Sequence, residues 1–407
     1  MNIIFISISS LPHISEHSIS LDLIHEFKKN GHDVYVLCSL DKNDERDTYL
    51  CEEDACKVLR VKIGKNKKAN IIEKGITTVM LPKLYVSAVK KYFSDVKFDL
   101  VVYPTPPVTQ VETVEYIKKR DGAKSYLLLK DIFPQNAVDL GMMSKTGIKG
   151  ILYKYFRRKE KRLYAISDTI GCMSEANVNY VLEHNPEVPA EKVEVCPNSV
   201  EMQDMEITEE EKTFMREKYN LPLNKKIFVY GGNLGKPQGI PYIIECLKTQ
   251  ITNEQAFFLI VGDGTEYSKL EKFIEEYSPS NVRLMKRLPK EDYDKLVAAC
   301  DVGLVFLDYR FTIPNFPSRI LGYMQAGLPI LACTDKNTDV GKTITDGGFG
   351  WWCESLKEED FATAVNKALE VDCRLTGKAG KQFLIENYSA EKEYNIVMTA
   401  NKELIYM

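Results

Sequence analysis

Short apolar runs alternate with amphipathic segments along the first half of the chain. Residues 2–9 read as a strand, residues 20–29 have the apolar spacing of a helix, and Asn30-Gly31 ends that helix. Further strands are predicted at 33–39, 98–103, 125–129, 169–173 and 193–196. Strands that alternate with helices predict a parallel sheet that is covered by helices on both faces.

A second series of the same kind follows a polar, acidic segment at residues 201–213, which we interpret as an inter-domain connection. The last helix, at about 389–405, is expected to pack back on the first domain. Strands are predicted at 226–231, 256–261, 282–285, 302–307 and 328–333.

These patterns predict an α/β fold of two doubly wound, Rossmann-like domains. The first comprises residues 1–200 with the returning segment 388–407, and the second comprises residues 201–387. The carboxyl ends of the two sheets are expected to face one another across a cleft, where ligands bind.

Composition narrows the class of protein only slightly. A chain of 407 residues with 44% apolar and 28% charged residues is typical of two globular domains, and a net charge of −4 argues against general attraction to nucleic acid. No apolar run approaches the roughly 20 residues of a membrane span, and the first residues do not resemble a signal peptide. The ten cysteines include no Cys-x-x-Cys pair, so we expect reduced, mostly buried thiols and a cytoplasmic location.

The strongest local signal is a glycine-rich turn between a strand and a helix. It runs from Val229 to Gly239 as Val-Tyr-Gly-Gly-Asn-Leu-Gly-Lys-Pro-Gln-Gly. Glycines allow close approach of the backbone to a phosphate, and free N–H groups at a helix start favour an anion. The spacing fits neither Gly-x-Gly-x-x-Gly nor the Walker pattern, and an ordinary tight turn is the alternative.

Two more segments of the second half carry candidate chemistry. Gly262-Asp263-Gly264 forms a second glycine turn, and residues 311–319, Phe-Thr-Ile-Pro-Asn-Phe-Pro-Ser-Arg, form a stiff loop that opens a helix at 320–326. Arg319 at that helix start suits a diphosphate through its planar fork and permanent charge. The alternative is a surface arginine at a loop-to-helix junction.

Six motifs in order point to one family. Besides the two glycine turns, they are Pro-Ser-Arg-Ile-Leu-Gly-Tyr-Met-Gln-Ala-Gly at 317–327, Asn-Gly-His-Asp-Val at 30–34, Lys-Asp-Ile-Phe-Pro at 130–134 and Val-Cys-Pro-Asn-Ser-Val at 195–200. Together they resemble the retaining GT-B glycosyltransferases of family four, particularly the branch with the fucosaminyltransferases of O-antigen and capsule assembly. The resemblance covers nearly the whole chain.

The resemblance implies the GT-B architecture and a second domain that holds a nucleotide-diphosphate sugar, expected to be UDP-linked. The first glycine turn and the stiff loop are then expected at the diphosphate and the donor sugar, and the segment after the strand 282–285 at the base. The implied donor-binding residues are Gly232, Asn233, Lys236, Gln238, Gly262, Glu266, Lys286, Arg287, Leu288, Asn315, Phe316, Ser318 and Arg319.

The chain departs from the family pattern at four positions. Asn233 and Gln238 stand where many relatives have Arg and Lys, although the Asn/Gln form is usual in the branch named above, and Lys236 or Arg319 is expected to compensate. Pro314 and Gly322 replace a pair of glutamates, the second of which usually binds ribose hydroxyls. The loss of that acceptor puts the usual ribose contact, or activity itself, in question.

On the first domain, the resemblance implies that Lys130 and Asp131 act with Arg319 as the catalytic residues. Lys130 is expected to place a positive charge near the donor phosphates, and Asp131 to contact a sugar hydroxyl. A helix N-cap before Phe133-Pro134 is the alternative role of Asp131.

The acceptor side is expected to include His13, His17 and Pro106. The two histidines lie in the first loop after a strand, and ordinary surface histidines are the alternative. The acceptor implied by the resemblance is a polyprenyl-diphosphate-linked saccharide of bacterial surface polysaccharide synthesis, and the donor sugar an N-acetylated hexosamine or deoxyhexosamine.

No cofactor or metal is expected for the transfer. Helix N-termini, backbone N–H groups and one or two cations can stabilise a leaving diphosphate, and the chain has no Asp-x-Asp metal motif. The charged residues 41–47 are interpreted as a loop. The resemblance also implies that the configuration of the anomeric carbon is retained. In such a transfer the donor phosphate itself can accept the proton of the acceptor.

A basic segment at residues 149–162 predicts a membrane contact. Its cations Lys154, Arg157, Arg158 and Lys161 lie among aromatic and aliphatic residues, a pattern that favours an anionic bilayer surface. We therefore expect a peripheral location on the inner face of the plasma membrane. An amphipathic helix with a solvated face is the alternative.

Two other functions stay open at this stage. A nucleotide-sugar 2-epimerase on the same architecture would need carboxylates and a histidine that the motifs do not supply. A catalytically impaired nucleotide-sugar-binding subunit is the second alternative, because of Pro314 and Gly322.

Overall fold

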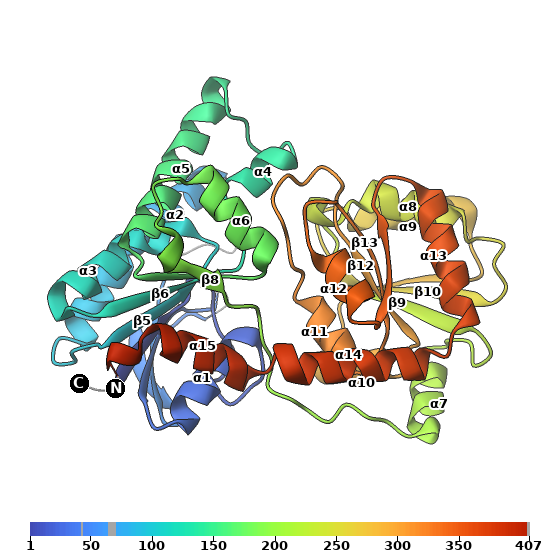
Figure 1. Cartoon of the computed structure of the whole chain (residues 1–407), viewed down its shortest axis with the longest axis horizontal. Coiled ribbons are helices and arrows are strands. Elements are labelled where there is room, and N and C mark those ends of the chain that lie inside the picture. The colour runs from blue at the N-terminus through green and yellow to red at the C-terminus, as the bar shows by residue number, and fades with distance from the viewer. Residues whose placement is uncertain (42–43, 64–70, 405–407) are drawn as a thin grey trace. The chain divides into compact units, whose positions relative to one another are not determined.

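The computed structural model describes residues 1–41, 44–63 and 71–404. The chain divides into two compact units (Figure 1). Unit 1 comprises Met1–Glu201 and Ala390–Met407, and unit 2 comprises Met202–Ser389. Within the described residues, none of the helices combines the length and the apolar character that a membrane crossing requires.

Unit 1 is built on an eight-stranded sheet of order β3-β4-β2-β1-β5-β6-β7-β8. All neighbours are parallel except β3 and β4. The strands are β1 Asn2–Ile6, β2 Asp33–Ser39, β3 Tyr49–Glu53, β4 Cys56–Val61, β5 Leu100–Pro104, β6 Lys124–Leu129, β7 Thr169–Cys172 and β8 Val193–Val195.

The helices of unit 1 cover this sheet with their apolar faces. They are α1 Ile19–Lys29, α2 Ile71–Tyr92, α3 Val111–Asp121, α4 Gln135–Asp139, α5 Gly147–Ile166, α6 Glu175–His184 and α15 Ala390–Ala400, with 3-10 turns η1 Val108–Gln110, η2 Ala190–Lys192 and η4 Lys402–Leu404. The hydroxyl of Ser18 caps α1 by accepting from Leu21 N–H. The C-terminal helix α15 lies beside α1 (Figure 1), and the ring of Tyr394 packs against Phe27 at 5.7 Å.

The hairpin β3–β4 differs from the all-parallel sheet that the pattern predicts. Its two turn residues, Asp54 and Ala55, have φ values of 47° and 59°, the left-handed conformation that a two-residue hairpin requires. The usual Asn-Gly signal is absent. Instead, the Arg60 guanidinium joins the strands by pairing with Glu53 at 2.9 Å, a contact that only the folded sheet creates.

Unit 2 has a six-stranded, fully parallel sheet of order β11-β10-β9-β12-β13-β14. The strands are β9 Lys226–Asn233, β10 Ala256–Asp263, β11 Val282–Met285, β12 Val302–Phe306, β13 Ile330–Thr334 and β14 Gly350–Glu354. Five of them match the predicted strands. The edge strand β14 was not predicted from the pattern.

The helices of unit 2 enclose an aromatic core of Phe228, Phe258, Phe306 and Phe361. They are α7 Glu209–Lys218, α8 Ile240–Lys248, α9 Tyr267–Tyr277, α10 Lys290–Ala298, α11 Arg319–Gln325, α12 Val340–Asp346, α13 Glu358–Glu370 and α14 Cys373–Asn387, with the 3-10 turn η3 Lys236–Gln238. Two parallel-sheet α/β domains are therefore confirmed.

The buried carboxylate of Asp301 fastens the first helix of unit 2 to its sheet. It accepts from Arg216 at 2.7 Å and from Lys212 at 2.9 Å, both on α7, and from the Ile227 N–H of β9 at 2.8 Å. Arg216 also donates to the carbonyl of Ala299. Because Asp301 is 17% exposed and Arg216 6%, the pair is largely removed from water.

We expect Asp301→Ala to destabilise unit 2 by about 3 kcal/mol, since it leaves the Arg216 cation buried without its partner. Urea denaturation followed by circular dichroism would measure the change. The control is Asp294→Ala, which removes a surface pair with Lys290 and should cost less than about 1 kcal/mol. Equal losses for the two variants would contradict the role of Asp301.

Candidate functional site

The first glycine turn is closed by the two side chains that replace the basic pair of many relatives. Asn233 Nδ2 donates to Gln238 Oε1 at 3.1 Å, and the Gly235 N–H donates to the same oxygen at 3.2 Å. Gly232 and Gly239 have φ values of +131° and +64°, which other residues rarely adopt. Asn233 and Gln238 thus shape the turn by neutral hydrogen bonds.

The second glycine turn packs directly on the first. A Cβ at Gly262 would lie 1.9 Å from the carbonyl oxygen of Gly232, and one at Gly264 would lie 2.2 Å from that of Leu234. Glu266 donates its N–H to the Leu234 carbonyl at 3.0 Å, and its carboxylate pairs with Lys269 at 2.6 Å. Close packing of the second turn on the first therefore explains why glycines stand at Gly262 and Gly264. Glu266 is engaged in an ion pair within its own segment.

Arg319, the first residue of α11, reaches the first glycine turn. Its Nη1 donates to the carbonyl of Gly231 at 3.0 Å, and its guanidinium lies 4.4 Å from the ring centroid of Tyr230. It also lies 3.4 Å from the position that a Cβ on Gly232 would take. Among the described residues it forms no ion pair, so a partly buried cation stands beside the turn without a counter-ion.

Three tyrosines hold this arrangement, and the sequence analysis missed them. The Tyr323 hydroxyl accepts from Gly231 N–H at 3.0 Å, and the Tyr230 hydroxyl donates to the Asn233 carbonyl at 2.7 Å. A Cβ at Gly231 would lie 1.6 Å from the Tyr293 hydroxyl. Burial raises the pKa of Tyr323 to about 12, which keeps it neutral. Tyr323 lies four residues after Arg319, a spacing that brings two side chains together on a helix, so the sequence could have indicated this pair.

The candidate donor-binding residues of the stiff loop before α11 differ in what they can offer a ligand. The Asn315 carbonyl accepts from the Thr338 hydroxyl at 2.5 Å, and its Nδ2 is buried without a partner. Phe316 is buried against Tyr388, with ring centroids 5.9 Å apart. Ser318 stands at the N-cap position of α11 and is exposed, and its side chain makes no capping hydrogen bond. Asn315 therefore offers a free donor, whereas Phe316 supports the loop.

The end of β13 carries a buried carboxylate that the sequence analysis also missed. Asp335 Oδ1 accepts from the N–H groups of Asn337 and Thr338, whereas its Oδ2 is buried without a partner. Burial raises the pKa of Asp335 to about 6. Since Thr338 bonds to both Asp335 and the Asn315 carbonyl, the two segments are linked.

Gly322 and Pro314, which stand where the family pattern has glutamates, differ in their surroundings. A Cβ at Gly322 would meet nothing within 4 Å, so open space lies in front of α11 at this point. Pro314 is buried in the loop. The space at Gly322 can accommodate a ligand group that a side chain would otherwise displace.

The segment after β11 carries exposed cations. Lys286 Nζ lies 3.1 Å from the ring centroid of Tyr267 and 3.8 Å from Asp263 Oδ1. The Arg287 N–H donates to Asp263 at 3.3 Å, and its side chain, like that of Lys236, is exposed and forms no ion pair within the described residues. Leu288, half-buried, follows them.

In unit 1, Lys130 follows β6 and its ammonium group is buried without a hydrogen-bond partner. The facing charge is Glu393 on α15, whose Oε2 accepts from the Ser199 hydroxyl and whose Oε1 has no partner. Burial lowers the pKa of Lys130 and raises that of Glu393, and the two charges oppose these shifts. Asn198 Oδ1 is a third buried polar atom without a partner.

Asp131 is a buried acid rather than a helix cap. Helix α4 begins at Gln135 with Pro134 at its N-cap, so the N-cap alternative is wrong. Asp131 Oδ2 accepts from Asn136 at 2.7 Å, and its Oδ1 is buried without a partner. Burial raises the pKa of Asp131 to about 6.

The structure separates the residues expected on the acceptor side. His13 is exposed and contacts Ser15 at 2.8 Å, in a local turn. His17 contacts Asp22 and Glu201. Pro106 is exposed and follows Thr105, whose hydroxyl donates to the Asp131 carbonyl at 3.2 Å. Pro106 is therefore next in sequence to a residue that contacts the Lys130–Asp131 segment.

Acidic partners pair with most cations of the basic segment, which forms helix α5. Arg157 pairs with Glu160, Lys161 with Glu187, and Lys159 and Arg162 with Glu112 and Glu115 of the neighbouring helix α3. The cations of the segment that form no ion pair within the described residues are Lys149, Lys154 and Arg158. The continuous basic rim expected from the sequence is thus largely paired.

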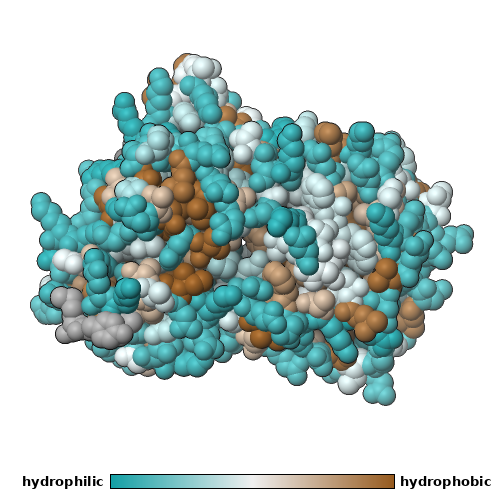
Figure 2. All heavy atoms as spheres, in the orientation of Figure 1, coloured by the Kyte–Doolittle hydropathy of each residue, from teal (hydrophilic) through white to brown (hydrophobic). Residues whose placement is uncertain are grey.

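The start of α5 exposes aliphatic side chains instead. Ile148 is 89% exposed, Ile151 71% and Leu152 50%. In Figure 2, hydrophobic and neutral residues interrupt the hydrophilic surface at the protruding end of this helix.

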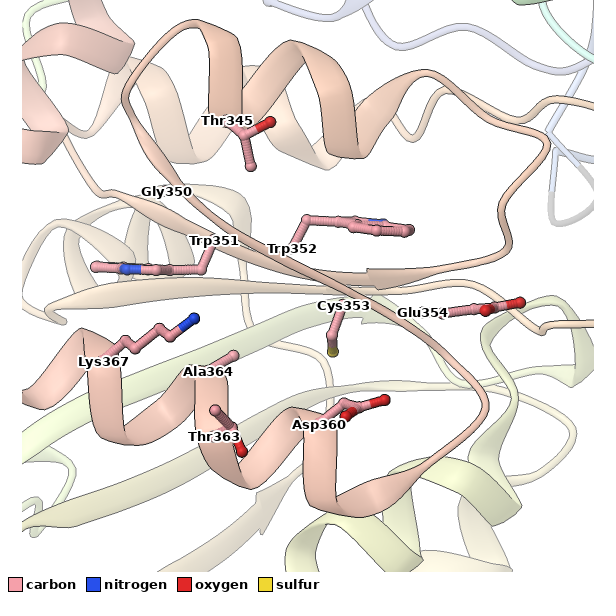
Figure 3. Close-up of a pocket in the computed structure, with 10 residues that line it drawn as sticks. All are labelled: Thr345, Gly350, Trp351, Trp352, Cys353, Glu354, Asp360, Thr363, Ala364 and Lys367. Carbon is pink, nitrogen blue, oxygen red and sulfur yellow. The ribbon is translucent and has the colours of Figure 1, made fainter.

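A depression at the edge of unit 2 lies along β14 and α13 (Figure 3). Trp351 and Cys353 point towards α13, whereas Trp352 points to the opposite face of the strand, as the alternation of a strand requires. The Trp352 indole N–H donates to Thr334 at 2.9 Å. None of the expected donor-binding residues lines this depression.

Comparisons with known proteins agree with this architecture. Residues 211–383 match the family model described as glycosyl transferases group 1. The chain is 26% identical to the probable glycosyltransferase WbjE of Pseudomonas aeruginosa over 330 residues, which are 81% of this chain and 80% of that protein. It is 24% identical to the putative colanic acid biosynthesis glycosyl transferase WcaI of Escherichia coli K12 over 366 residues, 86% and 87% of the two chains.

Among solved structures, the sucrose-phosphate synthase of Thermosynechococcus elongatus superposes with a TM-score of 0.77 at 16% identity. The match covers 100% of this chain and 99% of that one. At this identity, the likeness shows the fold.

The buried Asp131 carboxyl predicts a specific pH dependence. Because its folded pKa, about 6, lies above the ordinary value of 3.8, folding favours the protonated acid. Wild-type stability should therefore fall relative to Asp131→Asn as pH rises from about 4 to about 6. Melting temperatures across this range, with exposed Asp95→Asn as the control, measure the difference. A pH-independent difference between wild type and Asp131→Asn would contradict the burial of this acid.

Proposed function

We propose that this chain is a glycosyltransferase that transfers a sugar from a UDP-linked donor in bacterial surface polysaccharide synthesis. The match of residues 211–383 to the glycosyl transferases group 1 model and the fold shared with the sucrose-phosphate synthase structure support the proposal. Unit 2 binds the donor and unit 1 the acceptor, a polyprenyl-diphosphate-linked saccharide. The relative WcaI, a putative colanic acid biosynthesis glycosyl transferase, supports the assignment to polysaccharide synthesis.

The observation that carries the proposal is Arg319 without a counter-ion. Its guanidinium is fixed by Gly231 and Tyr230 next to the open edge of Gly232. A diphosphate supplies the missing negative charge, and the planar fork can bind two of its oxygens. Exposed Lys236 is the nearest further cation along this turn.

The remaining donor contacts follow from groups that the fold leaves unused. Asn315 Nδ2 and Asp335 Oδ2 are buried and without partners, and a donor sugar with hydroxyl and amide groups could satisfy both. Open space at Gly322 accommodates the ribose, while Lys286, Arg287 and Leu288 approach the base.

The transfer itself needs little covalent help from the protein. The bond from the anomeric carbon to the donor phosphate breaks, the acceptor oxygen bonds to the same face of that carbon, and the acceptor proton passes to the released phosphate oxygen. Arg319 stabilises the negative charge that develops on the diphosphate. This route requires no metal and retains configuration.

The acceptor lipid explains the exposed start of α5. Ile148, Ile151 and Leu152, beside the unpaired Lys149 and Lys154, form a surface suited to the interface of an anionic bilayer. We therefore propose a peripheral location on the inner face of the plasma membrane.

The proposal is tested first by a thermal-shift screen of nucleotides and UDP-sugars, followed by transfer assays with polyprenyl-diphosphate-linked saccharides. A donor that binds the native state raises the melting temperature. Conversion of a UDP-sugar without any acceptor would instead indicate the 2-epimerase. Donor binding without transfer or hydrolysis across a broad acceptor panel would indicate the impaired binding subunit.

We expect Arg319→Ala to weaken UDP binding at least tenfold, because it removes the guanidinium that contacts the glycine turn. Isothermal titration calorimetry with UDP measures the loss. Arg319→Lys should recover only part of it, since an ammonium group cannot bind two oxygens in a fork. Arg374→Ala, an exposed change on α14, is the matched control. Wild-type affinity in Arg319→Ala would remove the main phosphate contact of the proposal.

The membrane surface is tested by the triple variant Ile148→Ser, Ile151→Ser, Leu152→Ser. It should reduce binding to phosphatidylglycerol-containing vesicles by about tenfold or more, as three exposed aliphatic side chains are lost. Flotation of the vesicles measures the bound fraction. The control, Lys161→Gln, removes a cation that is already paired and should change binding little. Unchanged flotation of the triple variant would refute this surface.

A further inference from the structure

Four side chains of unit 1 that can ligate a metal converge, and one of them, His17, was expected on the acceptor side. His17 precedes α1, Asp22 and His25 lie on α1, and Glu201 follows β8. One nitrogen or oxygen from each lies within 4.8 Å of all the others. Asp22 is buried, and the other three are partly exposed, so an ion can enter from solvent.

The hydrogen bonds of His25 fix which of its nitrogens carries a proton. Its Nε2 lies 2.5 Å from the carbonyl oxygen of Ile14, which can only accept. In the neutral ring the other nitrogen, Nδ1, is therefore an acceptor, yet it faces Glu201 Oε2 at 3.2 Å. Two acceptors at this distance repel each other unless a proton or a metal ion lies between them.

The supporting contacts resemble those around metal ligands. A ligating histidine commonly donates its second N–H to a backbone carbonyl, as His25 does to Ile14. Asp22 is oriented by two backbone donors, the N–H of Ser18 at 3.2 Å and that of Glu201 at 2.9 Å. Its side chain is thus held towards the cluster independently of the histidines.

Three of the six distances between the ligand atoms fit a small tetrahedral ion, and the other three lie within 4.8 Å. Four ligands at the usual zinc distances stand about 3.3 Å apart. His17 Nδ1 lies 3.2 Å from Asp22 Oδ1 and 3.5 Å from Glu201 Oε2, and His25 Nδ1 lies 3.2 Å from Glu201 Oε2. Two imidazoles with two carboxylates suit Zn²⁺, whereas Ca²⁺ and Mg²⁺ favour shells of oxygen alone. We propose that His17, Asp22, His25 and Glu201 bind one Zn²⁺ ion.

The ion would fasten the point at which the chain leaves unit 1. Glu201 is the last residue of unit 1 before unit 2 begins, and the returning chain is anchored next to it, where Ala390 N–H donates to the Val200 carbonyl at 3.0 Å. Binding at Glu201 ties this junction to the start of α1. The role is structural and does not depend on the sugar-transfer proposal.

The test uses the untagged full-length protein, stripped with a chelator and titrated with ZnCl₂ at pH 7.5. Calorimetry and elemental analysis should show one Zn²⁺ bound per chain, with a rise in melting temperature. His25→Gln should weaken Zn²⁺ binding at least tenfold, as loss of a ligand does, while His13→Gln, a nearby histidine outside the cluster, should bind as wild type.

A second readout guards against misfolding of the variants. Co²⁺ added to the stripped wild-type protein should give the visible absorption of a tetrahedral site, and His17→Gln should reduce it. Absence of stoichiometric Zn²⁺ binding by the wild type would overturn the proposal and leave a protonated His25 as the bridge to Glu201. Equal affinities of His25→Gln and His13→Gln would overturn it as well.

Discussion

Arg319 brings a permanent positive charge against the carbonyl of Gly231, and no carboxylate among the described residues neutralises it. Placing such a charge partly out of water is unfavourable unless other groups compensate. The face of Tyr230 and the carbonyl dipole supply part of that compensation, and Tyr323 holds the turn in place. The architecture of unit 2 therefore holds a cation that no described carboxylate balances, as the proposed diphosphate contact requires.

Unit 1 contains a counterpart in which buried polar groups lack partners. Lys130, Glu393 and Asn198 each leave an atom unpaired, and Asp131 leaves one carboxylate oxygen. Buried polar atoms without hydrogen-bond partners lower the stability of the folded state. Lys130 and Asp131 follow β6 and Asn198 follows β8, in the unit to which we assign the acceptor.

Helix α5 illustrates how tertiary contacts revise a charge pattern. In sequence, its cations look like a basic rim, but α3 presents Glu112 and Glu115 to Lys159 and Arg162. What remains exposed at the start of the helix is a group of aliphatic side chains beside the exposed cations Lys149 and Lys154. A membrane contact of this protein would thus depend on apolar insertion as well as on charge.

The sequence by itself determined the α/β class, most strands and the place of Arg319 at a helix start, because strand and helix periods and glycine turns are local properties. Local signals did not reveal β14 or the β3–β4 hairpin, whose turn lacks the usual glycine and whose stability comes from the Arg60–Glu53 pair. Only the tertiary structure decided that Gly262 serves packing on the first turn, that Glu393 faces Lys130 from the end of the chain, and that Glu201 meets His25. These contacts join residues that are distant in sequence, and their formation depends on the whole sheet rather than on any segment alone.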